Sequence, residues 1–253
     1  MQFEPPSGNP LGTNKTFKFA SSLLIPILKL LTKRDWRGAN NLPKSGPVIV
    51  ISNHVSYADA LVFAHFLFAN GRAVRYLGKD SVFKTPVLGK ILLASGQIPV
   101  ARESDKASHA LDSALGLLKA GHCVGIYPEG TLTRDEALWP MVAKTGIARL
   151  AILSKAPVIP IAQWGDQNLL PRYSKKLVFW RRTQITYLAG PALDFSRWSG
   201  KEEDQAALIE ATAYAMAEIT KLLEQIRGEY APREIFDPHK SDLPRTGNFK
   251  KKD

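Results

Sequence analysis

Buried-looking strands alternate with amphipathic helices from about residue 46 to residue 225, and this alternation limits the possible folds more than any other feature. The apolar run at 47–52 predicts a strand, and the pattern at 58–69 predicts a helix. Further strands are expected at 73–77, 97–100, 123–127, 158–162 and within 177–188, and further helices at 86–94, 104–119, 145–154 and 202–225. Strands that take turns with helices favour an α/β fold, in which the helices cover a mainly parallel sheet. The sequence therefore predicts a single α/β domain with a mixed, mainly parallel sheet flanked by helices.

The chain divides into four expected parts. Residues 1–15 are rich in Pro, Gly and Asn and predict a flexible arm. Residues 16–34 predict an amphipathic helix that precedes the domain, and Pro26 should kink or split it. Residues 35–230 carry the domain itself. Residues 231–253 are rich in Pro, Arg and Lys, which predicts a basic, flexible tail.

The charge balance favours a polyanionic partner. Lys and Arg number 34 against 23 Asp and Glu, which gives a formal charge of +11. Nucleic acid, an anionic membrane surface and phosphorylated substrates all fit such an excess. No apolar stretch reaches the roughly 20 residues needed to span a bilayer. In the helix at 16–34 the lysines gather on one side and the apolar residues on the other. This helix can lie in a membrane interface or pack on the domain, and its wide apolar face favours the interface.

The chain has a single cysteine, Cys123, which limits disulfide and metal chemistry. One thiol excludes a disulfide within the chain and a cysteine-rich zinc site. Its place in an expected strand predicts a small, buried core residue.

His54 and Asp59 form the most informative pair of polar residues. They stand five positions apart, directly after the expected strand at 47–52 and across the start of the next helix. Ligands of open α/β sheets bind at the carboxyl ends of the strands. A histidine oriented by a carboxylate can take the proton of an alcohol and make it nucleophilic. The alternative is structural, with His54 at a helix start and Asp59 as an ordinary first-turn acid.

Other polar residues follow other expected strands. Lys79 and Arg102 end the second and third strands, where they could bind a phosphate or remain surface cations. The turn Glu129-Gly130-Thr131 follows the fourth strand and could face an anion through its backbone. For the Glu129 carboxylate we expect contact with a substrate hydroxyl or with nearby Arg side chains.

With four segments in this order, the chain resembles the 1-acyl-sn-glycerol-3-phosphate acyltransferase family. The H-x-x-x-x-D motif of that family is matched by NHVSYAD at 53–59. A block that runs from Lys through Pro and Gly to Arg is matched at 78–102. The blocks F-P-E-G-T-R-S and V-I-P-hydrophobic-A appear as YPEGTLT at 127–133 and VIPIA at 158–162. The resemblance covers about residues 40–190. One departure is Leu132, where the family usually has Arg, and Arg134 is a candidate to supply that charge.

The resemblance implies transfer of a fatty acyl group from a thioester to a glycerol-phosphate hydroxyl. His54 would be the general base and Asp59 its support. Lys79, Arg102 and the turn Glu129-Gly130-Thr131 would bind the acceptor phosphate, with Arg134 as a helper. The partners implied are lysophosphatidic acid and an acyl donor, either acyl-CoA or acyl carrier protein. No metal, no other cofactor and no covalent acyl-enzyme are expected, and the enzyme would lie on the cytoplasmic face of the cell membrane as a peripheral protein.

Three alternatives remain from the sequence. The same chemistry could act on glycerol 3-phosphate, a glycolipid or an amino-acid lipid, a possibility that Leu132 keeps open. A nucleic-acid-binding module is disfavoured, because the aromatic residues are scattered along the chain rather than interleaved with Lys and Arg on a strand, and no nucleic-acid motif is present. An inactive scaffold on a lipid surface is the third.

Overall fold

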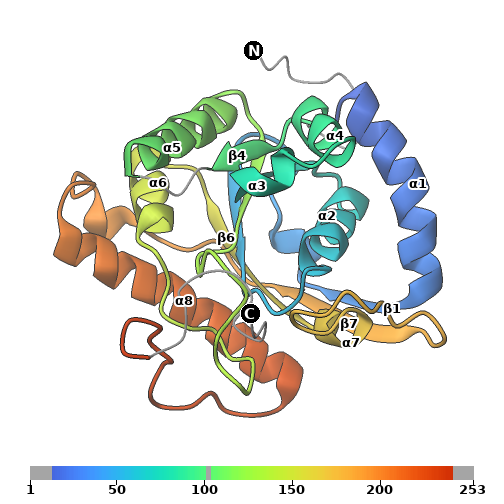
Figure 1. Cartoon of the computed structure of the whole chain (residues 1–253). Coiled ribbons are helices and arrows are strands. Elements are labelled where there is room, and N and C mark those ends of the chain that lie inside the picture. Colours follow the sequence, from blue (N-terminus) through green and yellow to red (C-terminus); the bar gives the residue numbers. More distant parts are fainter. Residues whose placement is uncertain (1–12, 101–103, 242–253) are drawn as a thin grey trace.

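The computed structural model describes residues 13–100 and 104–241, and within them a seven-stranded sheet forms the centre of the molecule (Figure 1). The strands in chain order are β1 (Thr32–Arg37), β2 (Val48–Ser52), β3 (Val74–Lys79), β4 (Ile98–Val100), β5 (Cys123–Ile126), β6 (Val158–Trp164) and β7 (Thr183–Ala189). In the sheet they lie in the order β1-β7-β6-β2-β5-β3-β4. All neighbours are parallel except β6 and β7, which are antiparallel. The predicted fold class is confirmed.

Helices cover both faces of the sheet. On one face lie α5 (Ser104–Lys119), α6 (Gly146–Ser154) and α8 (Gln205–Arg227), and on the other lie α1 (Lys15–Leu31) and α2 (Asp59–Ala69) (Figure 1). Residues of the fully buried strand β2 alternate between the two cores. Val48 and Val50 join the core under α1 and α2, whereas Ile49 and Ile51 join the core under α5, α6 and α8. A strand buried on both faces reads as a continuous apolar run, as it does here.

Shorter helices fill the connections between strands. They are α3 (Asp80–Phe83), α4 (Leu88–Ala94) and α7 (Asp166–Leu169), with a 3-10 turn at Ala39–Asn41. A second 3-10 turn, Ser196–Trp198, lies between β7 and α8. The expected helix at 104–119 has the observed bounds of α5, and most other expected elements differ by a few residues at their ends. The sequence analysis missed β1, α3 and α7.

The N-terminal helix ends earlier than expected and leads directly into an edge strand. α1 stops at Leu31, and Thr32 begins β1, which pairs in parallel with β7. The hydroxyl of Thr32 donates to the carbonyl oxygen of Leu28 at 2.6 Å and occupies an acceptor at the end of the helix. The helix runs through Pro26 without being split. At its start, the Asn14 side chain accepts the N–H of Phe17 at 2.8 Å and donates to the carbonyl of Ala94, so α1 is attached to the end of α4.

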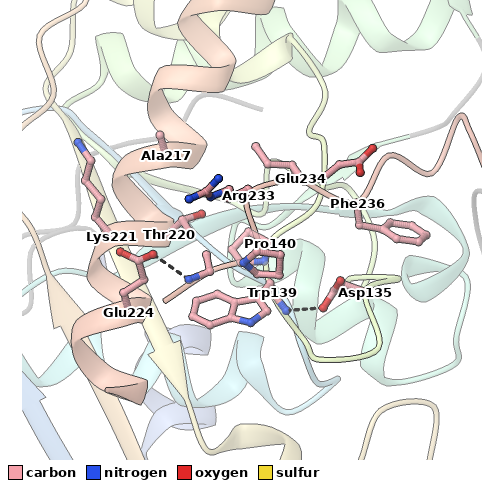
Figure 2. A pocket seen from close by; sticks show the side chains of 13 residues that line it. Asp135, Trp139, Pro140, Ala217, Thr220, Lys221, Glu224, Arg233, Glu234 and Phe236 are labelled. Carbon is pink, nitrogen blue, oxygen red and sulfur yellow. Dashed lines mark hydrogen bonds between the residues drawn. The ribbon is translucent and has the colours of Figure 1, made fainter. Parts of the chain in front are cut away.

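The segment after α8 packs on the domain. Residues 231–236 line a pocket of about 350 Å³ together with the last turns of α8 and residues 135–140 (Figure 2). The N–H of Ala231 donates to the Glu224 side chain at 2.8 Å, and the N–H of Val142 donates to the carbonyl of Phe236 at 3.0 Å. The first part of the expected tail is thus held against the loop that precedes α6. None of the helices within residues 13–100 and 104–241 has both the length and the apolar character needed to cross a bilayer.

Candidate active site

The expected pair His54 and Asp59 lies at the carboxyl edge of the sheet. His54 comes two residues after β2, a central strand, and Asp59 is the first residue of α2. The Nδ1 atom of His54 lies 2.8 Å from the Oδ2 atom of Asp59. The Asp59 side chain is fully buried, whereas 17% of the His54 side chain is exposed. An acid in the interior therefore holds a base that reaches the surface.

Asp59 is fixed by more than the imidazole. Its Oδ2 atom also accepts the N–H groups of Val55 at 2.7 Å and Ser56 at 2.9 Å. Burial raises the pKa of the Asp59 carboxyl, and the hydrogen bonds from His54, Ser56 and Val55 act in the opposite direction. An ionised Asp59 places the imidazole proton on Nδ1, so Nε2 is left as the basic nitrogen.

The imidazole ring is also held by an aromatic neighbour. The rings of His54 and Tyr127 stack with centroids 4.1 Å apart and planes 18° from parallel. Tyr127 in turn packs against Phe63 of α2, with centroids 6.2 Å apart. The carbonyl of His54 accepts the N–H of Thr133 at 2.8 Å. The segment after β5 therefore fixes both the ring plane and the backbone of His54.

Glu129 acts as a bridge between two backbone segments. Its Oε1 atom accepts the N–H of His54 at 3.1 Å, and its Oε2 atom accepts the N–H of Met141 at 3.1 Å. The residue is 3% exposed, and burial raises the pKa of its carboxyl to about 8 against the opposing effect of these bonds. We expected Glu129 to meet a substrate hydroxyl or arginine side chains. In the structure both of its oxygens face backbone N–H groups, which makes it a positioning residue for His54.

The turn at Gly130 and Thr131 brings in a cation that the sequence analysis missed. Gly130 has a φ of 69°, a left-handed conformation that suits glycine. A Cβ atom at this position would lie 3.1 Å from the Cε atom of Lys144, so the exposed Lys144 side chain runs along the turn. Thr131 is half-buried beside it. Lys144 is 14 residues from Gly130 in a loop without regular structure, and no spacing in the sequence links the two.

Arg134, expected to help bind a phosphate, lies in the interior. It is 1% exposed, and its guanidinium donates to the hydroxyl of Tyr173 and packs 5.5 Å from the centroid of that ring. Leu132, the departure from the family pattern, is also buried at 1% exposure. The side chains of Leu132 and Arg134 therefore point into the interior, where they support the site and do not face a substrate.

Lys79 is the last residue of β3, which pairs in parallel with β5, so its backbone lies at the same edge of the sheet as the Gly130 turn. The side chain of Lys79 and the whole of Arg102 lie outside the described residues. Their expected contact with a phosphate stays a prediction.

Two further contacts that the sequence analysis missed hold the His54 segment. The Asn53 side chain donates to the carbonyl of Gln163 at 3.0 Å and accepts the N–H of Gln163 at 2.9 Å, which links the end of β2 to β6. The hydroxyl of Ser56 donates to the carbonyl of Leu170 at 2.6 Å. In the described part of the chain, no group of three or more His, Cys, Asp and Glu side chains could hold a metal ion.

Comparison with known proteins assigns the family. The family model described as "Acyltransferase" matches residues 33–164, just over half of the 253 residues. The chain belongs to the acyltransferase family. The matched stretch includes every site residue discussed above apart from Leu170 and Tyr173, and it confirms the expected resemblance.

Several relatives of this chain carry the name of one kind of acyltransferase. The chain is 27% identical to the 1-acyl-sn-glycerol-3-phosphate acyltransferase of Bacillus subtilis over 213 residues, which cover 83% of this chain and 100% of that protein. It is 27% identical to the enzyme of that name from Borreliella burgdorferi over 75% of this chain and 71% of the relative. A chloroplastic relative of that name from Brassica napus is 30% identical over 148 residues, or 58% of this chain, and this chain spans only 41% of its length. Family and relatives confirm the expectation of an O-acyltransferase.

A solved structure supports the fold. The crystal structure of the 1-acyl-sn-glycerophosphate acyltransferase PlsC from Thermotoga maritima superposes with a TM-score of 0.65, over 85% of this chain and 84% of that one. At 20% identity this likeness concerns the fold alone.

Proposed function

We propose that this acyltransferase transfers a fatty acyl group from acyl-CoA or acyl carrier protein to the free hydroxyl of 1-acyl-sn-glycerol 3-phosphate, which gives phosphatidic acid. The observation that carries the proposal is the 2.8 Å contact between His54 Nδ1 and the buried Asp59. It leaves a basic nitrogen at the partly exposed edge of a fold that belongs to this family. The names of the relatives support the choice of acceptor.

The proposed reaction needs one base and good positioning. The Nε2 atom of His54 takes the proton of the acceptor hydroxyl while the hydroxyl oxygen attacks the carbonyl carbon of the thioester. The tetrahedral intermediate then collapses, the C–S bond breaks, and the imidazolium returns the proton to the departing thiolate. The products are an ester and a thiol. Asp59 stabilises the imidazolium, and because a thioester is already activated, the step calls for no metal or other cofactor.

The acceptor phosphate is assigned to three cations. Lys79 ends β3, Arg102 follows β4, and Lys144 lies along the turn formed by Gly130 and Thr131. Bidentate contact from an arginine and point charges from lysines suit a phosphate monoester. Arg134 and Glu129 are assigned to supporting the site, since both are buried.

The enzyme is proposed to act as a peripheral protein on the cytoplasmic face of the cell membrane, where its acceptor resides. Most of the apolar face expected to enter the interface packs on the domain instead, with Leu28 buried and Leu24 and Leu31 against the same core. The outward side of α1 carries a separate apolar stripe of Phe19, Leu23, Ile27 and Leu30, between 54% and 72% exposed. Exposed lysines of the same helix, Lys15, Lys18 and Lys29, accompany the stripe. Such a helix suits the interface of an anionic bilayer, and the net charge of +11 adds attraction.

The direct test supplies the purified full chain with a radiolabelled acyl donor and a panel of acceptors. Lysophosphatidic acid, glycerol 3-phosphate, a glycolipid and an amino-acid lipid are each offered with acyl-CoA and, separately, with acyl carrier protein. We expect turnover with lysophosphatidic acid that disappears in His54→Ala. Turnover only with another acceptor would overturn the proposed substrate and keep the chemistry. No thiol release with any combination would remove the proposed reaction.

A further inference from the structure

An aromatic tip protrudes from the loop between α7 and β7. Phe179 and Trp180 are 70% and 72% exposed, and their rings contact each other edge to face with centroids 5.8 Å apart. Burial of either ring in an apolar environment would be favourable by roughly 2 kcal/mol or more, so such exposure in water is costly. Contiguous exposed apolar surface is a mark of protein or membrane contact sites.

The charge around the tip has one sign. Lys175, Lys176, Arg181 and Arg182 flank the two rings and are all exposed. The sequence from 167 to 193 contains no Asp or Glu. Aromatic rings between cations match the two layers of an anionic membrane interface, in which rings enter the headgroup region and cations meet lipid phosphates. A protein partner would need an acidic surface opposite these cations. Nothing in the geometry of the loop selects such a partner.

The loop is attached to the end of α1. The Nη2 atom of Arg182 donates to the carbonyl oxygens of Thr32 at 2.8 Å and Lys29 at 3.3 Å. Figure 1 shows this yellow-orange loop reaching the end of α1 that leads into β1, on the outer side of the molecule. The aromatic tip therefore continues the surface begun by the apolar stripe of α1, whose last exposed member is Leu30.

The base of the loop touches the catalytic segment. The carbonyl of Leu170 accepts the hydroxyl of Ser56 at 2.6 Å, and the ring of Tyr173 lies edge to face with Tyr57 at 6.3 Å between centroids. Both Ser56 and Tyr57 lie between His54 and Asp59. A contact made by the tip is thus connected through the loop to the residues that carry the chemistry.

We propose that the segment 175–182 is a second membrane anchor, which binds an anionic bilayer through Phe179 and Trp180 with Lys175, Lys176 and Arg181 at the headgroups. The inference rests on the proposed membrane-borne acceptor. Two contacts, α1 and this loop, restrict how the domain tilts on the bilayer more than either would alone. The stripe of α1 is a narrow contact, and the loop widens it at one end of the helix. The second anchor keeps the edge that carries His54 oriented toward lipid.

Tryptophan fluorescence tests the anchor directly. Of the tryptophans in the chain, Trp139 and Trp198 are buried, Trp36 and Trp164 are half-buried, and Trp180 is largely exposed. The full chain is mixed with vesicles of equal parts phosphatidylcholine and phosphatidylglycerol that contain brominated acyl chains. We expect a blue shift and quenching of the emission in the wild type, and neither in Trp180→Phe. Vesicle binding without a contribution from Trp180 to the shift would overturn the proposal.

Binding of variants to the same vesicles gives a second measurement. We expect the double variant Phe179→Ser/Trp180→Ser to bind at least about a hundredfold more weakly. The control is Tyr230→Ser, which removes an aromatic ring 93% exposed elsewhere and should bind as the wild type does. Lys175→Glu/Lys176→Glu should lose at least about fivefold per residue on these vesicles. Its control Lys119→Glu/Lys201→Glu makes the same charge change at the end of α5 and before α8, on the opposite side of the molecule in Figure 1.

Activity separates this proposal from the proposed function. With a short-chain acceptor kept below its critical micelle concentration, the tip variants should match the wild type, whereas acceptor presented in vesicles should be used about tenfold more slowly. Equal loss in both assays, or full binding and activity of the tip variants on vesicles, would overturn the anchor. Absence of turnover by the wild type with the short-chain acceptor would count against the proposed function and leave the fluorescence result to decide the anchor.

Discussion

The Oε1 atom of Glu129 accepts the backbone N–H of His54 at 3.1 Å, so an acid from the strand end of β5 holds the main chain of the base at the strand end of β2. The two strands are parallel neighbours, with Ile51 paired to Ile126, and the residues three positions beyond each of these face one another across the edge. Through its second oxygen Glu129 also holds Met141 of the loop that precedes α6. A single buried carboxyl group therefore joins three segments of the site.

Glu129→Gln should separate positioning from substrate binding. The amide keeps one acceptor oxygen but turns an NH₂ group toward one of the two backbone N–H groups, so one bond is lost. We expect the free energy of unfolding to fall by about 1–3 kcal/mol. We also expect kcat to fall roughly tenfold through misplacement of His54, with KM for the acceptor little changed. Denaturant unfolding and steady-state kinetics would measure both. A normal stability with a large rise in KM would instead mean that Glu129 contacts the acceptor.

Asp59→Asn should keep the shape of the site and lose its electrostatics. The Asn oxygen can still accept the N–H groups of Val55 and Ser56, which now meet Oδ2 of Asp59. The neutral amide no longer stabilises the imidazolium, so we expect kcat to fall roughly a hundredfold or more. Acceptor binding should stay near normal, as judged by KM and calorimetry. His54→Ala should abolish turnover while the circular dichroism spectrum is retained. A fully active Asp59→Asn would show that the pair is structural.

The cations assigned to the acceptor phosphate should determine affinity for a phosphorylated acceptor. For Arg102→Ala and Lys144→Met we expect KM for lysophosphatidic acid to rise roughly tenfold, the value of one charge-assisted hydrogen bond. The matched control Lys119→Met removes an exposed lysine at the end of α5 and should change nothing. Monoacylglycerol, which lacks the phosphate, provides the second comparison, since its KM should be the same in all variants. An equal rise for both acceptors would remove these residues from the phosphate site.

What the sequence predicted is local in the chain. An apolar run predicts the strand β2, and periodicity predicts the helix α5. His54 contacts Asp59 because a spacing of five residues across a strand-to-helix turn brings the two side chains together. The edge strand β1 was missed, because its sequence TKRDWR is charged and only partly buried and has no apolar run. This strand forms because β7 offers it a backbone hydrogen-bonding partner, which the sequence of β1 alone does not reveal.

The less predictable part of the site depends on contacts between distant segments. From the sequence, Arg134 was expected to help bind a phosphate. In the structure it is buried, and its guanidinium donates a hydrogen bond to the hydroxyl of Tyr173, 39 residues further on. Glu129 looked like a substrate ligand, yet its partners are backbone N–H groups, which no residue type reveals. Lys144 reaches the Gly130 turn through a loop whose path no periodicity predicts. Residue identity thus predicted which chemistry is present, and the fold decided which side chains face outward.

Two buried histidines should make stability depend on acid. Burial lowers the pKa of His65 and of His122 to about 4 from 6.5. Below pH 6.5 these two imidazoles bind protons in the unfolded chain but stay neutral in the native state. They therefore reduce the free energy of unfolding as the pH falls toward 4. The raised pKa of Glu129 works in the opposite sense, so the effect must be measured as a difference between variants.

The comparison uses His65→Gln and His122→Gln in urea unfolding at neutral pH and at the pH of a mild acetate buffer. Relative to its own value at neutral pH, each variant should lose less stability in acid than the wild type, by roughly 2 kcal/mol. His109→Gln replaces an exposed histidine of α5 and serves as the control, with the acid response of the wild type expected. If both buried-site variants showed the same acid loss as the wild type, neither imidazole would be held neutral by the fold. The cause of acid unfolding would then have to be sought among the carboxylates.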